Sequence, residues 1–142
     1  MGARARGLLR VGEKAGVDMN IENTKRLIEV APKLYGGMTR QENVGIITPI
    51  MFGFECGDGW FEILLELSEK LEALGQGIEA SQVKEKYGTL RFYIHGGTEE
   101  AYALIGEAEK KSAKTCELCG KPARLRDVDG WCMTECDECF EK

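Results

Sequence analysis

The strongest pattern of apolar and polar positions in the chain lies between Trp60 and Leu74. Apolar side chains recur there in steps of four and three residues, at Trp60, Leu64, Leu67, Leu71 and Leu74. This spacing places them on one stripe of an α-helix, and glutamates occupy several of the remaining positions. The pattern therefore predicts a helix whose apolar stripe is the centre of the core.

Two further helices are predicted on either side of this one. Residues 21–35 carry apolar side chains at helical spacing, with Asn23 or Thr24 as the N-terminal cap and Pro32 placed to end or kink the helix. Thr98 can cap the other helix, which ends in a run of lysines before the last quarter of the chain.

Two segments have the patterns of strands. Residues 44–54 form a continuous apolar run, in which Pro49 favours an edge strand or two short pieces. Residues 82–95 alternate as a β-hairpin does, and Gly88 followed by Thr89 can form its two-residue loop as a type II′ turn. We expect this hairpin to form the middle of a small sheet.

The position of the loop determines which side chains of the hairpin share a face. The face expected in the core carries Val83, Glu85, Tyr87, Leu90, Phe92 and Ile94. The other face is basic and aromatic, and carries Lys84, Lys86, Arg91, Tyr93 and His95. Lys86 is expected opposite Arg91, a like-charge pair that costs stability unless an acidic strand or an acidic partner lies nearby.

Cysteines distinguish the last quarter of the chain. Two Cys-x-x-Cys pairs, Cys116 with Cys119 and Cys136 with Cys139, are separated by sixteen residues. Four thiolates at such spacing are typical of a zinc ion in a closed tetrahedral site, which is structural rather than catalytic. Cys132 could instead replace Cys136 or Cys139, and a disulfide or redox cluster is the alternative to a metal.

Composition narrows the class of protein. The chain has 142 residues, of which 43% are apolar and 30% charged, so we expect a globular protein. Its net charge of −5 argues against coating nucleic acid or anionic membrane by bulk attraction. The sequence shows neither a secretory signal nor an apolar run of about 20 residues, so we expect a cytoplasmic protein with reduced cysteines.

Basic and aromatic residues form a candidate binding surface. Its members are Lys84, Lys86, Arg91, Tyr93, Arg124 and Arg126. Such residues can bind phosphates and stack a base, or they can form an ordinary solvated face of a sheet. Because the whole chain is acidic, we expect a protein partner, with nucleic acid as the alternative.

Cys56 is a further candidate for chemistry. It lies between Glu55 and Asp58, ahead of the predicted central helix, where a thiol could act as a nucleophile. The two carboxylates would raise its pKa, however, and the single histidine, His95, is distant in sequence. We therefore expect a small buried cysteine with Asp58 capping the helix, and keep a thiol enzyme as the alternative.

Three stretches resemble a family of small uncharacterised phage and prophage proteins. They are residues 53–61 (GFECGDGWF), 83–93 (VKEKYGTLRFY) and 130–139. The resemblance covers about residues 35–140. It implies a phage or mobile-element context and a zinc module, and it implies no activity. Members of that family often have a histidine where this chain has Cys139, which favours Cys139 over Cys132 as a ligand.

Together these patterns predict an α+β protein. We expect a flexible leader over residues 1–19, a helix-backed antiparallel sheet over 20–113, and a treble-clef or zinc-ribbon module over 114–142. The predicted function is that of a non-enzymatic, zinc-containing binding protein.

Overall fold

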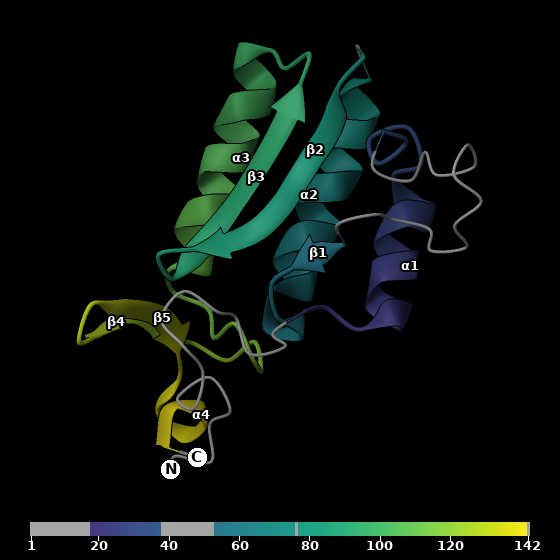
Figure 1. Ribbon diagram of the computed structural model, residues 1–142. Helices are drawn as coiled ribbons and strands as arrows, with labels where there is room; N and C mark the ends of the chain where they lie inside the picture. Colours follow the sequence, from purple (N-terminus) through teal and green to yellow (C-terminus); the bar gives the residue numbers. More distant parts are fainter. Residues whose placement is uncertain (1–17, 38–52, 76, 142) are drawn as a thin grey trace.

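The computed structural model describes residues 18–37, 53–75 and 77–141 of the chain (Figure 1). Most of the predicted leader and most of the apolar run at 44–54 lie outside these residues. The elements are α1 (Ile21–Val30), β1 (Phe54–Glu55), the 3₁₀ turn η3 (Asp58–Trp60), α2 (Phe61–Leu74), β2 (Glu79–Lys86), β3 (Thr89–His95), α3 (Glu99–Ser112), β4 (Arg124–Val128), β5 (Trp131–Glu135) and α4 (Asp137–Glu141).

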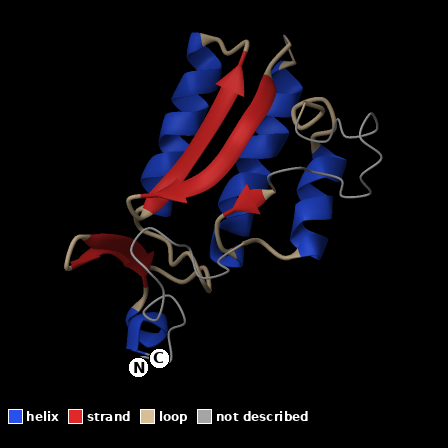
Figure 2. Ribbon diagram, in the orientation of Figure 1, coloured by secondary structure: helices blue, strands red, loops and turns tan. Residues whose placement is uncertain are grey.

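The larger sheet has the strand order β1-β2-β3, with β1 parallel to β2 and β2 antiparallel to β3. Helices α2 and α3 lie side by side on one face of the β2–β3 hairpin, and α1 packs against α2 (Figure 2). A second sheet of β4 and β5 lies at the turn end of this hairpin and is followed by α4. The predicted α+β class, with a helix-backed and mostly antiparallel sheet, is confirmed.

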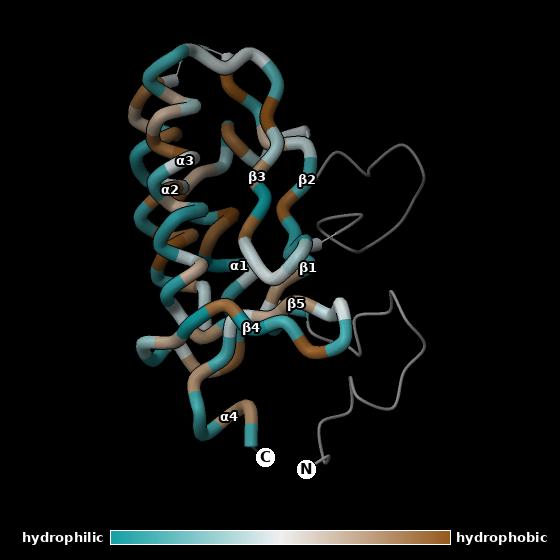
Figure 3. Tube along the Cα trace, turned by 90° about the vertical axis from the view of Figure 1, so that its left-hand side faces the viewer, coloured by the Kyte–Doolittle hydropathy of each residue, from teal (hydrophilic) through white to brown (hydrophobic). Residues whose placement is uncertain are grey.

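The core forms along the predicted stripe of α2. Trp60, Leu64, Leu67 and Leu71 are buried, and Leu74 packs partly buried against them. Figure 3 shows α2 and α3 on one side of the molecule, with β2 and β3 beside them on the other. The outer face of the hairpin is thus left uncovered by α2 and α3.

Helix caps differ in part from the predictions. Thr98 caps α3 as expected, since its hydroxyl accepts from the N–H of Ala101. Helix α1 is capped by Asn20 instead of Asn23 or Thr24. The prediction that Asp58 caps α2 is wrong, because its carboxylate accepts from the N–H of Asn20 and ties α1 to the turn before α2.

The predicted loop of the β2–β3 hairpin is wrong by one residue, which shifts the pairing of the strands by two residues. The two loop residues are Tyr87 and Gly88, both with positive φ (56° and 88°), as a type I′ turn requires. Glu85 therefore pairs with Leu90, and Lys84 instead of Lys86 lies opposite Arg91. Tyr87 leaves the predicted core face and is 68% exposed.

Glu85 has a local role in this turn. One of its carboxylate oxygens accepts the N–H of Gly88 at 2.7 Å. That bond explains how a carboxylate is accommodated on the face that also carries the buried Val83 and Leu90.

None of the helices that the structure describes is long and apolar enough to cross a membrane.

Candidate metal centre

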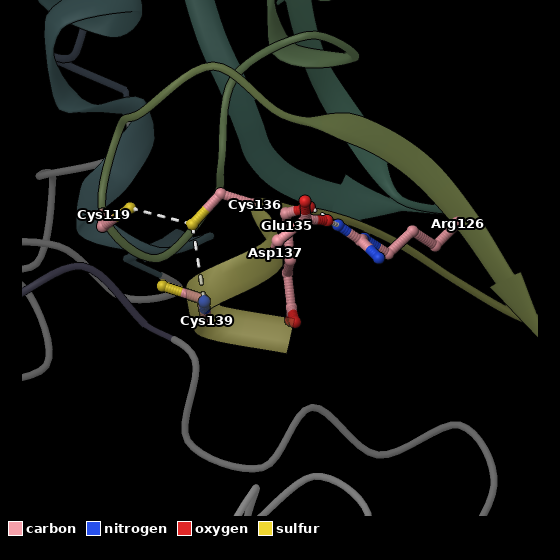
Figure 4. A network of polar contacts seen from close by, with 6 residues as sticks. All are labelled: Cys119, Arg126, Glu135, Cys136, Asp137 and Cys139. Atoms are coloured by element: carbon pink, nitrogen blue, oxygen red, sulfur yellow. Dashed lines mark hydrogen bonds and ion pairs between the residues drawn. The ribbon is translucent and has the colours of Figure 1, made fainter. Parts of the chain in front are cut away.

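Four cysteine sulfurs come together beyond the second sheet. Cys116 and Cys119 lie on the turn before β4, and Cys136 and Cys139 lie at the start of α4. Their Sγ atoms all lie within 4.8 Å of one another. Figure 4 shows Cys119, Cys136 and Cys139 directed toward one another, with Cys119 Sγ 3.6 Å from Cys136 Sγ.

The local backbone holds the sulfurs in place. Gly120, with φ of 86°, donates its N–H to the carbonyl of Cys116 and closes the first turn. In the second pair, the N–H of Cys139 donates to Cys136 Sγ at 3.4 Å and lowers the pKa of Cys136 to about 7. Burial raises the pKa values of Cys119 and Cys139, because a thiolate away from water needs a nearby positive charge.

This geometry fits a metal ion. Tetrahedral zinc–thiolate bonds of about 2.3 Å separate two sulfurs by about 3.8 Å, close to the separations in this cluster. A bound cation would supply the charge that lets the thiols ionise. Cys132 lies on β5 with Asp127 as its neighbour on β4, and it is not part of the cluster.

The first cysteine turn is docked on the core. Glu117, the residue after Cys116, is buried there. Its carbonyl accepts the N–H of Gly59 at 2.7 Å, and its carboxylate accepts the N–H of Gly57 at 2.9 Å. The indole of Trp60 donates to the carbonyl of Thr115 at 2.8 Å.

Close approach explains the two glycines. A Cβ at Gly57 would overlap the carbonyl oxygen of Glu117, and a Cβ at Gly59 would overlap that of Cys116. Asp58 lies between the two glycines. Its carboxylate accepts from the backbone N–H of Asn20 and from the side-chain amide of Asn23. The turn before α2 therefore contacts the cysteine turn on one side and the start of α1 on the other.

A second contact joins the two hairpins. The hydroxyl of Thr134 on β5 donates to the carbonyl of Gly88 at 2.7 Å, and Leu125 of β4 lies against Gly88. The cysteine-bearing segment is thus held to the core at the turn before α2 and at the β2–β3 turn.

Arg126, predicted to be part of a binding surface, is engaged within its own segment. Its guanidinium donates to the carboxylate of Asp137 at 2.5 Å and to the carbonyl of Glu135 at 2.9 Å (Figure 4). The guanidinium also stacks on the ring of Phe140. Its side chain is only 10% exposed, and it holds the pKa of Asp137 below its usual range. These contacts tie β4 to α4 and leave the guanidinium little accessible.

The other members of the predicted surface are only partly brought together. Lys84, Lys86, Arg91 and Tyr93 share the outer face of the β2–β3 hairpin. Arg124 is exposed on β4, in the other sheet. The hairpin residues therefore form one surface without the two arginines.

The cysteine and histidine considered for catalysis are apart from these surfaces. Cys56 is 0% exposed and lies in the main core cluster. His95 is exposed at the far end of β3, opposite Glu79. The burial of Cys56 closes it to a substrate and argues against a thiol enzyme.

A scan of protein-family models, a search of curated proteins and a search of solved structures each found no match to this chain.

Sequence reasoning did not find the docking role of Glu117, Gly57 and Gly59. A glutamate inside a Cys-x-x-Cys pair looks like a solvated residue. The two glycines around Asp58 indicated only a tight turn. The available signal was that both glycines allow another backbone segment to approach closely.

Proposed function

We propose that the protein is a non-enzymatic binding protein whose cysteine segment is held by one zinc ion. Cys116, Cys119, Cys136 and Cys139 would provide four thiolates, and four protein ligands leave no open position for catalysis. The clustering of the four sulfurs within 4.8 Å is the observation that carries this proposal. Bound zinc would contribute folding energy and fix the orientation of the segment.

The order of elements supports a treble-clef arrangement over a simple ribbon. A cysteine turn at Cys116–Gly120 is followed by the β4–β5 hairpin and then by α4, which carries the second cysteine pair at its start. Residues 114–141 are held to the core by hydrogen bonds of Thr115, Glu117 and Thr134. We therefore propose that zinc fixes the position of the cysteine segment beside the β2–β3 hairpin.

We assign recognition to the outer face of the β2–β3 hairpin and to a protein partner. Lys84, Lys86 and Arg91 place three cations there, with Tyr93 42% exposed beside them. Aromatic and arginine side chains are enriched in protein interfaces. The resemblance of the 53–61 and 83–93 stretches to phage proteins supports a phage or mobile-element context.

Nucleic acid is the second candidate partner. The exposed rings of Tyr87 and Tyr93 beside Lys84, Lys86 and Arg91 are the kind of surface on which bases stack and phosphates bind. The acidic net charge of the chain favours the protein partner.

Affinity capture on the immobilised protein distinguishes the two. We expect a protein partner that is retained after nuclease treatment and lost when Lys84, Lys86 and Arg91 are all changed to Ala. The matched control changes Lys25, Arg26 and Lys110, three exposed cations on α1 and α3, and should retain the partner. Capture that disappears with nuclease and weakens steeply with salt would favour nucleic acid. Capture unaffected by the hairpin triple variant would reject this face.

A further inference from the structure

The outer face of the β2–β3 hairpin has an ordered layout of charge. Across the three strands, Glu55 pairs with Lys84 and Lys84 pairs with Arg91, so two cations and one carboxylate lie in one row. The next row toward the turn holds Lys86 and Thr89. The positive charge is therefore concentrated near the turn end of the hairpin.

These cations, Lys84, Lys86 and Arg91, lack direct ion pairs in the part of the chain that the structure describes. Lys84 and Arg91 are directly opposed on neighbouring strands, a placement that destabilises a hairpin when both are charged. Glu55, beside Lys84 on β1, offsets part of this cost, and an anionic partner would offset more of it.

Arg91 carries a more specific indication. Within the described part of the chain, its Nε is the one side-chain nitrogen that is buried and lacks a hydrogen-bond acceptor. Buried polar groups are almost always satisfied, so this unmatched donor costs stability in the free protein. The Nε itself is closed to a partner, but a guanidinium also carries two terminal nitrogens, and such a pair can bind both oxygens of a carboxylate.

The edge of the sheet shows how a partner can approach. Two outward N–H groups of β3 are already used, since Leu90 donates to Ser112 Oγ at 2.9 Å and Phe92 donates to Glu109 Oε2 at 3.2 Å. A partner strand cannot add to these groups without displacing α3. Recognition by the side chains of the open face remains available.

The surrounding charges favour a protein segment over a nucleic acid. Glu55 lies in the same row as the cations, and Glu79 lies opposite His95 at the far end of the hairpin. A continuous polyphosphate along the strands would meet these carboxylates. A peptide with a few acidic side chains can place them at Lys84 and Arg91 alone, with Tyr93 packing beside it.

We infer that Arg91 and Lys84 form a carboxylate-binding subsite for an acidic segment of a partner protein. This inference rests on the proposed binding role of the hairpin face and adds the chemistry that the face recognises. Arg91 is the bidentate anchor, Lys84 adds a second positive charge, and Tyr93 contributes apolar contact.

The test is a calorimetric titration of the full-length, zinc-loaded protein with a short glutamate-rich peptide at low salt. Arg91→Met should weaken peptide binding about tenfold or more, the effect of losing one charge-assisted contact. The same change on α1, Arg26→Met, should leave the affinity unchanged. Thermal unfolding of the free Arg91→Met variant should occur at the same or a higher temperature, because the unmatched buried donor is gone.

Three results would overturn the inference. They are the absence of peptide binding, equal weakening by Arg26→Met and Arg91→Met, and tighter binding of an oligothymidylate of matched charge. A lowered unfolding temperature for Arg91→Met would make Arg91 a structural residue and would also count against it. Zinc content, measured on the same samples, decides the metal-site proposal separately from the peptide result.

Discussion

Replacing Gly59 with alanine is expected to destabilise the whole protein by about 3 kcal/mol, because the new methyl group would be forced into a packed backbone contact. A Cβ at this position would overlap the carbonyl oxygen of Cys116 and press on the backbone of Glu117. The hydrogen bond from the N–H of Gly59 to the Glu117 carbonyl would be strained as well. The neighbours are main-chain atoms, so no side-chain rotation can relieve the overlap.

The same change should also weaken metal binding. Cys116 must move if its carbonyl is displaced, and its sulfur would move with it. Denaturant unfolding measures the loss of stability, and competition with a chelator measures the loss of affinity. Stability and zinc affinity are expected to fall together, because the contact of Gly59 with the cysteine turn supports both the core and the ligand Cys116.

Gly106 provides the matched control. It lies within α3, and a Cβ there would meet nothing within 4 Å. Gly106→Ala should therefore stabilise the protein by about 0.5–1 kcal/mol through its higher helix propensity. Equal stability of the Gly59→Ala and wild-type proteins would show that the cysteine turn does not pack on the core as described.

The second large effect is expected for the loss of a cysteine ligand. Cys136→Ser should reduce zinc affinity by more than about 100-fold, because even outer contacts of a metal site are worth 10- to 100-fold. Without the metal, no ion would hold the three remaining cysteines and the serine together. We expect the segment from residue 114 onward to lose protection from hydrogen exchange.

Cys132→Ser is the internal comparison, since Cys132 lies on β5, just before Cys136, but not in the sulfur cluster. Its zinc affinity should equal that of the unsubstituted protein. Trp60 gives a second signal, because it is 0% exposed and its indole bonds to Thr115 beside the first cysteine pair. Its fluorescence should change on metal removal in the unsubstituted and Cys132→Ser proteins. Similar zinc affinity for the Cys136 and Cys132 variants would contradict the ligand set.

The helices and the sulfur cluster were accessible to sequence reasoning for simple physical reasons. The stripe from Trp60 to Leu71 repeats with the period of an α-helix, and its burial follows from that period. Two Cys-x-x-Cys pairs limit where four sulfurs can meet, and the structure brings together the four that the spacing indicated. In both cases the signal is local.

The hairpin register was not accessible in the same way. Gly88 can be the first residue of a type II′ loop or the second residue of a type I′ loop, and the two differ by one position. The structure has the type I′ turn, with Tyr87 at a positive φ that tyrosine rarely adopts. The register decides which lysine opposes Arg91, and so it changes the details of the candidate binding face.

The docking of the cysteine segment depends on contacts between distant parts of the chain. Glu117 meets Gly57 across 60 residues, and Thr134 meets Gly88 across 46. Neither contact leaves a periodic pattern in the sequence. The glycines at 57 and 59 are necessary for the approach, but they do not identify what approaches.

The metal content of the purified protein tests the central proposal most directly. Protein expressed with adequate zinc and purified under reducing conditions should contain one zinc ion per chain by elemental analysis. A chelator that removes the zinc should release residues 114–141 from the core, seen as faster hydrogen exchange in that segment and at the turn before α2. Folded, reduced protein that contains no zinc after metal-replete expression would contradict the account.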